Sequence, residues 1–185
     1  MGFSIGALNL WLPFALGYCL VWLTIKLASR NIKREAAGGY AEEYGNKQLV
    51  YLFGYYPFLA LAIASIFVPI QFDILFWPGL IVFIFGITIN IITINTFIRS
   101  GERLKTSGFY RYSRNPMYLA NLIYILGLTL MGWAQSCANL FFILLTLFWM
   151  GGTHWCVLRE EAHLAKKFGQ DYLDYKKRTP RYWLI

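Results

Sequence analysis

Two groups of residues in this chain of 185 residues have the types and spacing to do chemistry, and the first surrounds a predicted helix start. It is the string Gly108-Phe109-Tyr110-Arg111-Tyr112-Ser113-Arg114-Asn115-Pro116-Met117-Tyr118. Asn115 is a favourable N-cap and Pro116 suits the first helical position, so we expect a helix to begin here. The first free N–H groups, near Met117 and Tyr118, and the charge of Arg114 would attract an anion. Alternatively, the string only starts a helix that basic residues anchor.

The second group is the carboxylate pair Glu160-Glu161, which comes just after an apolar stretch. Unpaired carboxylates at this position cost free energy, so we expect them to face a polar cavity, a cationic ligand or Arg114. The alternative is a solvated pair at a helix end. His154 precedes the pair and is either a cavity residue, a proton acceptor or a hydrogen-bonded structural histidine. His163 follows Glu160 by three residues, a spacing that echoes a carboxylate-bridged metal motif, but there is one copy and no further histidine or carboxylate ligand in the nearby stretches, so we predict no metal site.

The elements that position these residues are predicted from composition. The chain is 58% hydrophobic and 14% charged, against roughly 45–50% and about 25% in soluble domains. A spanning helix needs about 18 or more apolar residues, because the bilayer offers its backbone no hydrogen-bond partners. Five stretches reach or approach this length: 5–28, 49–70, 74–98, 117–133 and 138–158. We therefore predict an all-α polytopic membrane protein with five transmembrane helices in a single membrane domain, 1–185.

The distribution of charge predicts the orientation. Lysine and arginine follow the first, third and fifth stretches, and loops of this kind stay on the cytoplasmic side. The N-terminus is then outside, the C-terminus inside, and only Asp73 among the ionisable side chains lies on the outer face. The net charge of +8 faces anionic lipid headgroups, which explains the basic loops without a nucleic acid partner. The small size suggests a bacterial or archaeal plasma membrane.

The termini and cysteines add two expectations. An uncharged N-terminus argues against a cleaved signal peptide, so we expect the first stretch to remain in the mature chain. Cys19, Cys137 and Cys156 show no paired spacing and predict neither a disulfide framework nor a thiolate metal site.

The fifth stretch is expected to continue into the cytoplasm. Residues 159–177 place apolar and charged side chains at helical spacing, which predicts an amphipathic helical extension that Gly169 weakens only modestly. We expect a bend at Gly151-Gly152, where a ligand can approach the backbone. The third stretch ends in polar residues that either line an interior site or form interhelical hydrogen bonds. These residues are Thr88, Asn90, Thr93, Asn95 and Thr96.

A family resemblance is carried by four strings together. They are Gly108-Phe109-Tyr110, Arg114-Asn115-Pro116-Met117-Tyr118, Glu160-Glu161 and Phe168-Gly169-Gln170-Asp171-Tyr172-Leu173-Asp174-Tyr175. Over residues 104–180 the chain resembles the C-terminal half of the isoprenylcysteine carboxyl methyltransferase and phospholipid methyltransferase superfamily. Many members carry histidine where this chain has Asn115. The first three stretches match in type rather than in motif, so substrate choice is expected to differ there, in 1–100.

The resemblance implies an integral-membrane methyltransferase whose S-adenosylmethionine is held within 101–185, at the cytoplasmic face. The local chemistry agrees, because the cofactor's carboxylate suits Arg114 and the helix start, its ribose suits Glu161, and its sulfonium suits carboxylates or aromatic rings. Positioning does most of the work in methyl transfer, and Arg114, Glu160 and Glu161 are the catalytic candidates. The expected cofactor-binding residues are Tyr110, Tyr112, Arg114, Asn115, Pro116, Met117, Tyr118, His154, Glu160 and Glu161.

The methyl acceptor is expected to be lipophilic and to enter from the bilayer. A prenylcysteine carboxylate, a phospholipid amine and a small lipophilic thiol or amine all remain compatible. One alternative function is an NADPH-dependent membrane lipid or sterol reductase, with Arg103, Lys105, Arg111 and Arg114 as phosphate ligands. Another is a non-enzymatic membrane scaffold or small transporter, although no charge lies deep within a stretch to mark an ion path.

Overall fold

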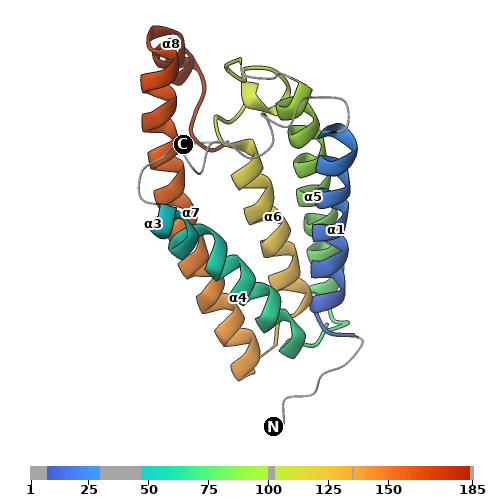
Figure 1. Ribbon diagram of the computed structural model, residues 1–185. Helices are drawn as coiled ribbons and strands as arrows, with labels where there is room; N and C mark the ends of the chain where they lie inside the picture. Colours follow the sequence, from blue (N-terminus) through green and yellow to red (C-terminus); the bar gives the residue numbers. More distant parts are fainter. Residues whose placement is uncertain (1–7, 30–46, 100–102, 135, 184–185) are drawn as a thin grey trace.

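The protein is a bundle of helices (Figure 1), seen here in a computed structural model that describes residues 8–29, 47–99, 103–134 and 136–183. The described residues form no strand, and the one β-bridge joins Asn9 to Pro69. The α-helices are α1 (Trp11–Ser29), α3 (Lys47–Val50), α4 (Tyr56–Ala64), α5 (Phe76–Arg99), α6 (Pro116–Met131), α7 (Cys137–Phe168) and α8 (Gln170–Arg178). The all-α prediction is confirmed over this part of the chain.

Each of the five predicted apolar stretches coincides with a helical segment. Two helices within the described ranges, α5 and α7, are long and apolar enough to cross a membrane. Three shorter apolar segments, Trp11–Leu27, Tyr51–Phe67 and Pro116–Met131, complete the set. Residues 5–7 of the first predicted stretch lie outside the described residues. The number of crossings and the orientation stay predictions.

The second predicted stretch, 49–70, is not one regular helix. After α3 the chain forms a π-helical segment, Tyr51–Tyr55, then α4, and ends in a 3₁₀ turn, Ser65–Phe67. The π-helical segment packs directly on α7, where a Cβ at Gly152 would collide with the carbonyl oxygen of Phe53. Gly151 and Gly152 stay within one continuous α7. The missing side chain of Gly152 therefore admits a neighbouring backbone, where the sequence suggested a ligand.

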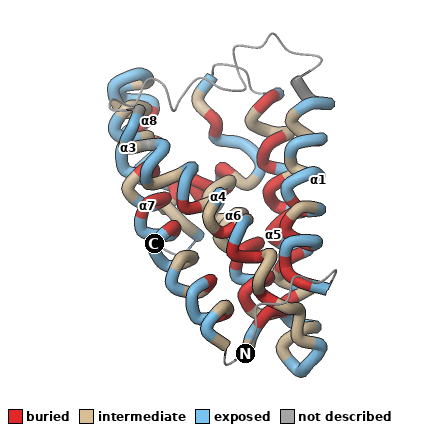
Figure 2. The backbone as a smooth tube through the Cα atoms, turned by 60° about the horizontal axis from the view of Figure 1, so that its bottom comes forward, coloured by how far each residue is buried: buried red, intermediate tan, exposed pale blue. Residues whose placement is uncertain are grey.

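Helices α5 and α6 form an antiparallel pair held close by glycine. A Cβ at Gly86 would lie 2.5 Å from the backbone nitrogen of Tyr124, and one at Gly127 would overlap the backbone of Phe83. The Tyr124 hydroxyl donates to the carbonyl oxygen of Phe14 at 3.1 Å, which ties α1 to the pair. Figure 2 shows the buried residues concentrated where α1, α4, α5 and α6 meet. This core fixes the position at which α6 begins.

Helix α7 exposes an apolar face along its first half. Leu140, Phe141, Leu144, Leu147 and Phe148 recur at helical spacing, and each is 54–59% exposed. Water would disfavour a continuous apolar stripe of this kind, whereas lipid would accommodate it. The apolar part of α7 ends at Leu158, and the residues beyond it form a charged extension.

The charged extension is broken where the sequence predicted a continuous helix over 159–177. Gly169 has φ +53°, a left-handed conformation that ends α7 at Phe168, and α8 begins at Gln170. Glycine adopts this conformation without the steric cost that a Cβ imposes. Figure 1 shows the chain turning back after α8 toward the start of α6. This return brings the end of the chain to the predicted site.

The polar residues of α5 divide between two roles. Thr88, Asn95 and Thr96 donate to carbonyl oxygens of their own helix. Asn90 donates instead to Asn121 of α6, which confirms an interhelical hydrogen bond at one position. Thr93 is fully buried, and its hydroxyl has no hydrogen-bond partner among the described residues.

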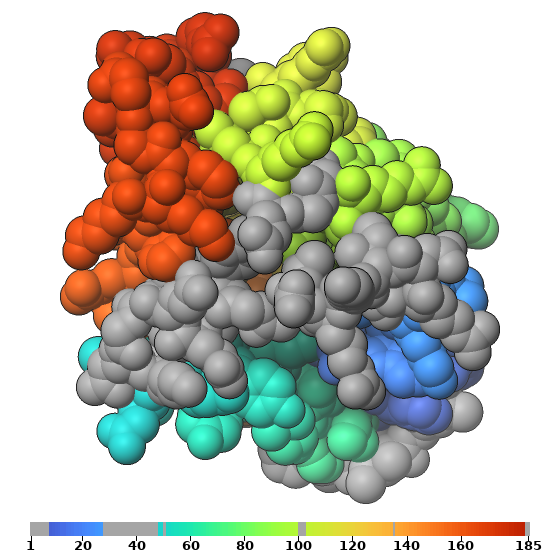
Figure 3. Space-filling view, turned by 45° about the horizontal axis from the view of Figure 1, so that its top comes forward, coloured from blue at the N-terminus to red at the C-terminus, as the bar shows by residue number. Residues whose placement is uncertain are grey.

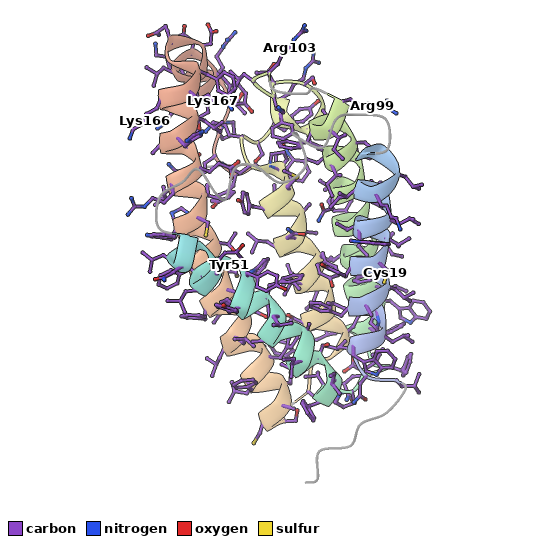
Figure 4. All side chains as sticks on the ribbon, viewed as in Figure 1. Cys19, Tyr51, Arg99, Arg103, Lys166 and Lys167 are labelled. Carbon is purple, nitrogen blue, oxygen red and sulfur yellow. The ribbon has the colours of Figure 1, made fainter. Side chains whose placement is uncertain are left out.

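Basic side chains gather at one end of the bundle. Figure 4 labels Arg99, Arg103, Lys166 and Lys167, and all four lie toward the end that carries α8. The residues preceding α6 and the end of α7 lie at this same end, so the two groups of chemical interest share a basic surface.

Candidate active site

The candidate site forms where three segments meet: the start of α6, the charged part of α7 and the segment that follows α8. Figure 3 shows the C-terminal part, in red, against the yellow-green segment that leads into α6. Asn115 is the N-cap residue and Pro116 the first residue of α6, as the sequence predicts. The segment after α8, residues 179–183, is called here the returning segment. The backbone N–H of Arg114 donates to the carbonyl oxygen of Pro180 at 2.9 Å, so the returning segment lies along the start of α6.

At the centre of this junction lies Glu161, which is 4% exposed. Arg181 donates to its two carboxylate oxygens from Nε and a terminal nitrogen, both at 3.1 Å. Arg114 donates from Nε at 3.2 Å, and Asn115 donates from its side-chain amide at 3.1 Å. We call these four residues, Arg114, Asn115, Glu161 and Arg181, the Glu161 cluster. The Asn115 side-chain amide thus donates to the Glu161 carboxylate and to the carbonyl oxygen of Arg181, and its side chain does not cap α6.

The cluster keeps Glu161 ionised. Burial alone would raise the pKa of Glu161, but the hydrogen bond from Arg181, the charges of Arg114 and Arg181 and the Asn115 amide together hold it below its ordinary value. The same hydrogen bond raises the pKa of Arg181. Two guanidinium groups around one carboxylate leave the cluster with one net positive charge.

The Arg114 side chain also fastens the segment that follows α8. One terminal nitrogen donates to the carbonyl oxygens of Lys176 at 2.9 Å and Thr179 at 2.7 Å. Together with its two bonds to Glu161, the guanidinium makes four hydrogen bonds inside the protein. Ser113 adds a bond from its hydroxyl to the Arg181 carbonyl oxygen at 3.0 Å. In this arrangement Arg114 and Glu161 organise the site, and their predicted contacts with a cofactor stay a prediction.

Glu160 lies outside the cluster and has a different environment. It accepts a hydrogen bond from the Tyr118 hydroxyl at 2.9 Å and is partly exposed. Burial raises the pKa of Glu160, the bond from Tyr118 lowers it, and the charge of Glu161 raises it again, with a net increase. The adjacent carboxylates therefore differ. The negative charge of Glu161 is compensated by two arginines, whereas the described hydrogen bond to Glu160 comes from the uncharged Tyr118 hydroxyl.

A cavity of about 600 Å³ adjoins the cluster. Its lining includes four basic residues, Lys176, Lys177, Arg178 and Arg181. His154 and Tyr182 also line it, with His154 Nδ1 3.0 Å from the Tyr182 hydroxyl. The predicted residues Arg114, which precedes α6, and His154, on α7, thus share one cavity.

Of the ten predicted cofactor-binding residues, Arg114 and His154 line this cavity and the other eight do not. Tyr110 is buried, and its carbonyl oxygen accepts a hydrogen bond from the Tyr175 hydroxyl at 2.6 Å, which braces α8. Tyr112 is 58% exposed. Met117 and Pro116 form the first turn of α6, and Pro116 is buried. Their assignment to cofactor binding stays a prediction.

Comparison with known proteins identifies the family. The model of the phospholipid methyltransferase family matches residues 74–171, more than half of the chain. The chain belongs to this family. The matched region of the phospholipid methyltransferase fold contains α5, α6 and α7, and with them Arg114, Asn115, Glu160 and Glu161.

Curated relatives agree with this assignment. The protein-S-isoprenylcysteine O-methyltransferase of Rattus norvegicus is 27% identical over 142 residues, covering 65% of this chain and 49% of the relative. The protein of the same name from Mus musculus is 34% identical over 77 residues, covering 42% of this chain and 26% of the relative. The match of this phospholipid methyltransferase family member thus spans about half the length of the rat protein, 49%, and 26% of the mouse protein. No solved structure matches the chain.

Sequence reasoning missed Arg181 and Tyr182. Both follow the residues that match the family model, and neither belongs to a recognisable motif. One signal was available: a glutamate buried between an apolar helix and a basic segment requires compensation, and a second arginine supplies it. The position of that arginine depends on the return of the chain after α8, which the sequence did not predict.

Proposed function

We propose that this protein transfers a methyl group from S-adenosylmethionine to a lipophilic acceptor at the membrane surface. The observation that supports this proposal is that the two carboxylates have different partners. Glu161 is bonded to two arginines, while the described hydrogen bond to Glu160 comes from Tyr118. A site for a ligand with both a cationic centre and a carboxylate needs such a separation of charge. Membership of the phospholipid methyltransferase family supports this choice of chemistry.

The donor set fits the charges of S-adenosylmethionine. Its sulfonium and ammonium groups suit Glu160 and the ring of Tyr118, because a carboxylate and an aromatic face both stabilise a cation. Its carboxylate suits the basic lining, where Lys176 and Arg178 offer donors. When bound, the cofactor supplies a methyl group on a positively charged sulfur. The Glu161 cluster would hold α6, α7 and the returning segment in register around it.

We assign the acceptor to the membrane side of the site. The exposed apolar face of α7 and the apolar helices before residue 100 suit a lipid chain, which would bring the reacting group to the cytoplasmic ends of α6 and α7. We further propose five crossings, with the site at the cytoplasmic face. Where the acceptor must lose a proton, His154 lines the cavity and has a ring nitrogen for it.

Calorimetric titration of the detergent-purified protein tests the cofactor. S-adenosylmethionine and S-adenosylhomocysteine should bind saturably, and NADPH should not. Glu160→Gln removes the carboxylate charge and should weaken S-adenosylmethionine binding about tenfold, roughly 1.4 kcal/mol. Asp174→Asn is the matched control, because Asp174 is an exposed carboxylate on α8 bonded to Lys177. Preferential binding of NADPH, or equal affinity in wild type and Glu160→Gln, would contradict the proposal.

A transfer assay tests the reaction itself. The protein in nanodiscs receives S-adenosylmethionine labelled in its methyl group, together with N-acetyl-S-farnesylcysteine, dioleoyl phosphatidylethanolamine or dodecanethiol. Label should move to at least one of these, because they present a carboxylate, an amine and a thiol on an apolar chain. A failure with all three acceptors, in protein that binds the cofactor, would refute transfer to a lipophilic acceptor of these classes.

A further inference from the structure

The last two described residues reach back to two different helices. The hydroxyl of Tyr182 lies 3.0 Å from His154 Nδ1 on α7. The ring of Trp183 stacks on Phe85 of α5, with ring centroids 6.5 Å apart and an interplanar angle of 24°. Two adjacent aromatic side chains therefore bridge from α7 to α5, and they do so beside the cavity that Tyr182 lines.

The bridge lies toward the apolar part of α7. His154 precedes Glu161 by seven residues on one continuous helix, about 10 Å at 1.5 Å per residue, and it lies within the apolar part of α7. Lys176 and Lys177 of α8, which belongs to the charged extension, also line the cavity. Phe85 lies well inside the apolar α5. A molecule approaching the cavity from the bilayer would meet the aromatic pair first.

The two aromatic side chains and Phe85, on which Trp183 stacks, have surface available for contact. Trp183 is 47% exposed and Phe85 is 45% exposed, while Tyr182 is partly exposed. Aromatic rings of this kind bury large apolar areas against a partner and keep a polar group for orientation. The exposed surface therefore suits the apolar chain of a lipid-like acceptor.

The aromatic pair is also held in place. Arg181, immediately before it, binds Glu161 through two nitrogens, and its carbonyl oxygen accepts a bond from Ser113. The backbone is thus fixed up to the residue that precedes Tyr182. Removing either ring should leave these anchors intact.

We propose that Tyr182 and Trp183 determine acceptor specificity, as an aromatic wall past which the acceptor's apolar chain must pass. The inference rests on the proposed function and adds residues that lie beyond the family match at 74–171. A wall of fixed rings limits the bulk of the chain that can pass it, and pockets of this kind discriminate by about 10–200-fold. Slim chains should pass more readily than bulky ones.

The test compares bulky and slim members of two acceptor classes in the nanodisc assay. The pairs are N-acetyl-S-geranylgeranylcysteine with N-acetyl-S-geranylcysteine, and dioleoyl phosphatidylethanolamine with lysophosphatidylethanolamine. Tyr182→Ala and Trp183→Ala should raise the bulky-to-slim ratio of kcat/KM about tenfold for the class that is methylated. Tyr182→Phe retains the ring and should keep the wild-type bulky-to-slim ratio of kcat/KM. Trp77→Ala is the matched control, because Trp77 is 67% exposed at the far end of α5.

The outcomes separate this inference from the proposed function. If wild type fails to bind S-adenosylmethionine, or methylates neither class, the proposed function falls and this inference falls with it. If wild type methylates an acceptor and both alanine variants keep its bulky-to-slim ratio, the inference alone is refuted. Calorimetry of S-adenosylmethionine with Trp183→Ala checks folding, because Trp183 does not line the cavity, and the dissociation constant should stay within about twofold of wild type, under 0.5 kcal/mol.

Discussion

Replacing Arg114 by alanine should lower stability more than replacing Arg181, the other arginine of the Glu161 cluster. The variant loses two bonds to Glu161 and two to the carbonyl oxygens of Lys176 and Thr179. The Arg114 side chain is 8% exposed. Removing one member of a buried ion pair costs about 3–5 kcal/mol, and Glu161 retains Arg181, so we expect the lower half of this range from the pair. The two carbonyl oxygens add about 1 kcal/mol each.

Arg181→Ala provides the comparison within the same cluster. Its side chain is 30% exposed, and Glu161 would keep Arg114 and Asn115, so we expect a loss of about 1–2 kcal/mol after allowing for solvent screening. For a chain of this length, 1 kcal/mol corresponds to about 2–4 °C in Tm. The Tm in detergent should therefore fall by about 10–24 °C for Arg114→Ala, from a total of about 5–6 kcal/mol, and by about 2–8 °C for Arg181→Ala.

Tryptophan fluorescence during heating of the detergent-purified variants measures these shifts. Lys177→Ala serves as the control, because it removes an ion pair whose lysine is 72% exposed, and its Tm should match wild type. A larger fall for Arg181→Ala than for Arg114→Ala would refute this account. So would equal Tm values for Arg114→Ala and Lys177→Ala.

Three further predictions use the same thermal assay. Gly152→Ala should lower Tm, because its Cβ would overlap the Phe53 carbonyl oxygen, whereas Gly151→Ala, with open space around it, should not. Wild type should lose stability as the pH falls below about 4.5, the ordinary pKa, because Glu161 has a lowered pKa when folded and its stabilisation is lost on protonation. Glu161→Gln should remove that part of the pH dependence. Gly169→Ala should cost about 1 kcal/mol, since φ +53° disfavours any residue with a Cβ; an unchanged Tm would count against this reading of the α7–α8 joint.

Local signals in the sequence predicted the part of the site that depends on neighbouring residues. Asn115-Pro116 marked the start of α6, and the apolar run before Glu160 marked the end of the apolar part of α7. Arg114 was one of the partners expected for the carboxylate pair, because a carboxylate beside an apolar helix needs a cation or a polar cavity. These expectations succeeded because each involved one helix end or one strong electrostatic requirement.

The rest of the site depends on conformations that one stretch of sequence does not determine. Gly169 is compatible with a helix interior, and its left-handed φ, which separates α7 from α8, is known only from the structure. Gly152 appeared free for a ligand because the irregular π-helical segment beside it was predicted as regular helix. Arg181 reaches Glu161 only after the chain reverses at α8. Each error came from tertiary contacts between segments distant in sequence.

The Glu161 cluster also sets an order on biosynthesis. The Arg114 guanidinium can bond to the carbonyl oxygen of Thr179 only after the ribosome has added 65 further residues. At 5–20 residues per second this delay is about 3–13 s, during which the preceding helices can already insert into the bilayer. Substitutions in the returning segment should therefore yield molecules that insert normally yet fail to complete their cytoplasmic end, so a correct membrane topology alone would not show that the site has formed.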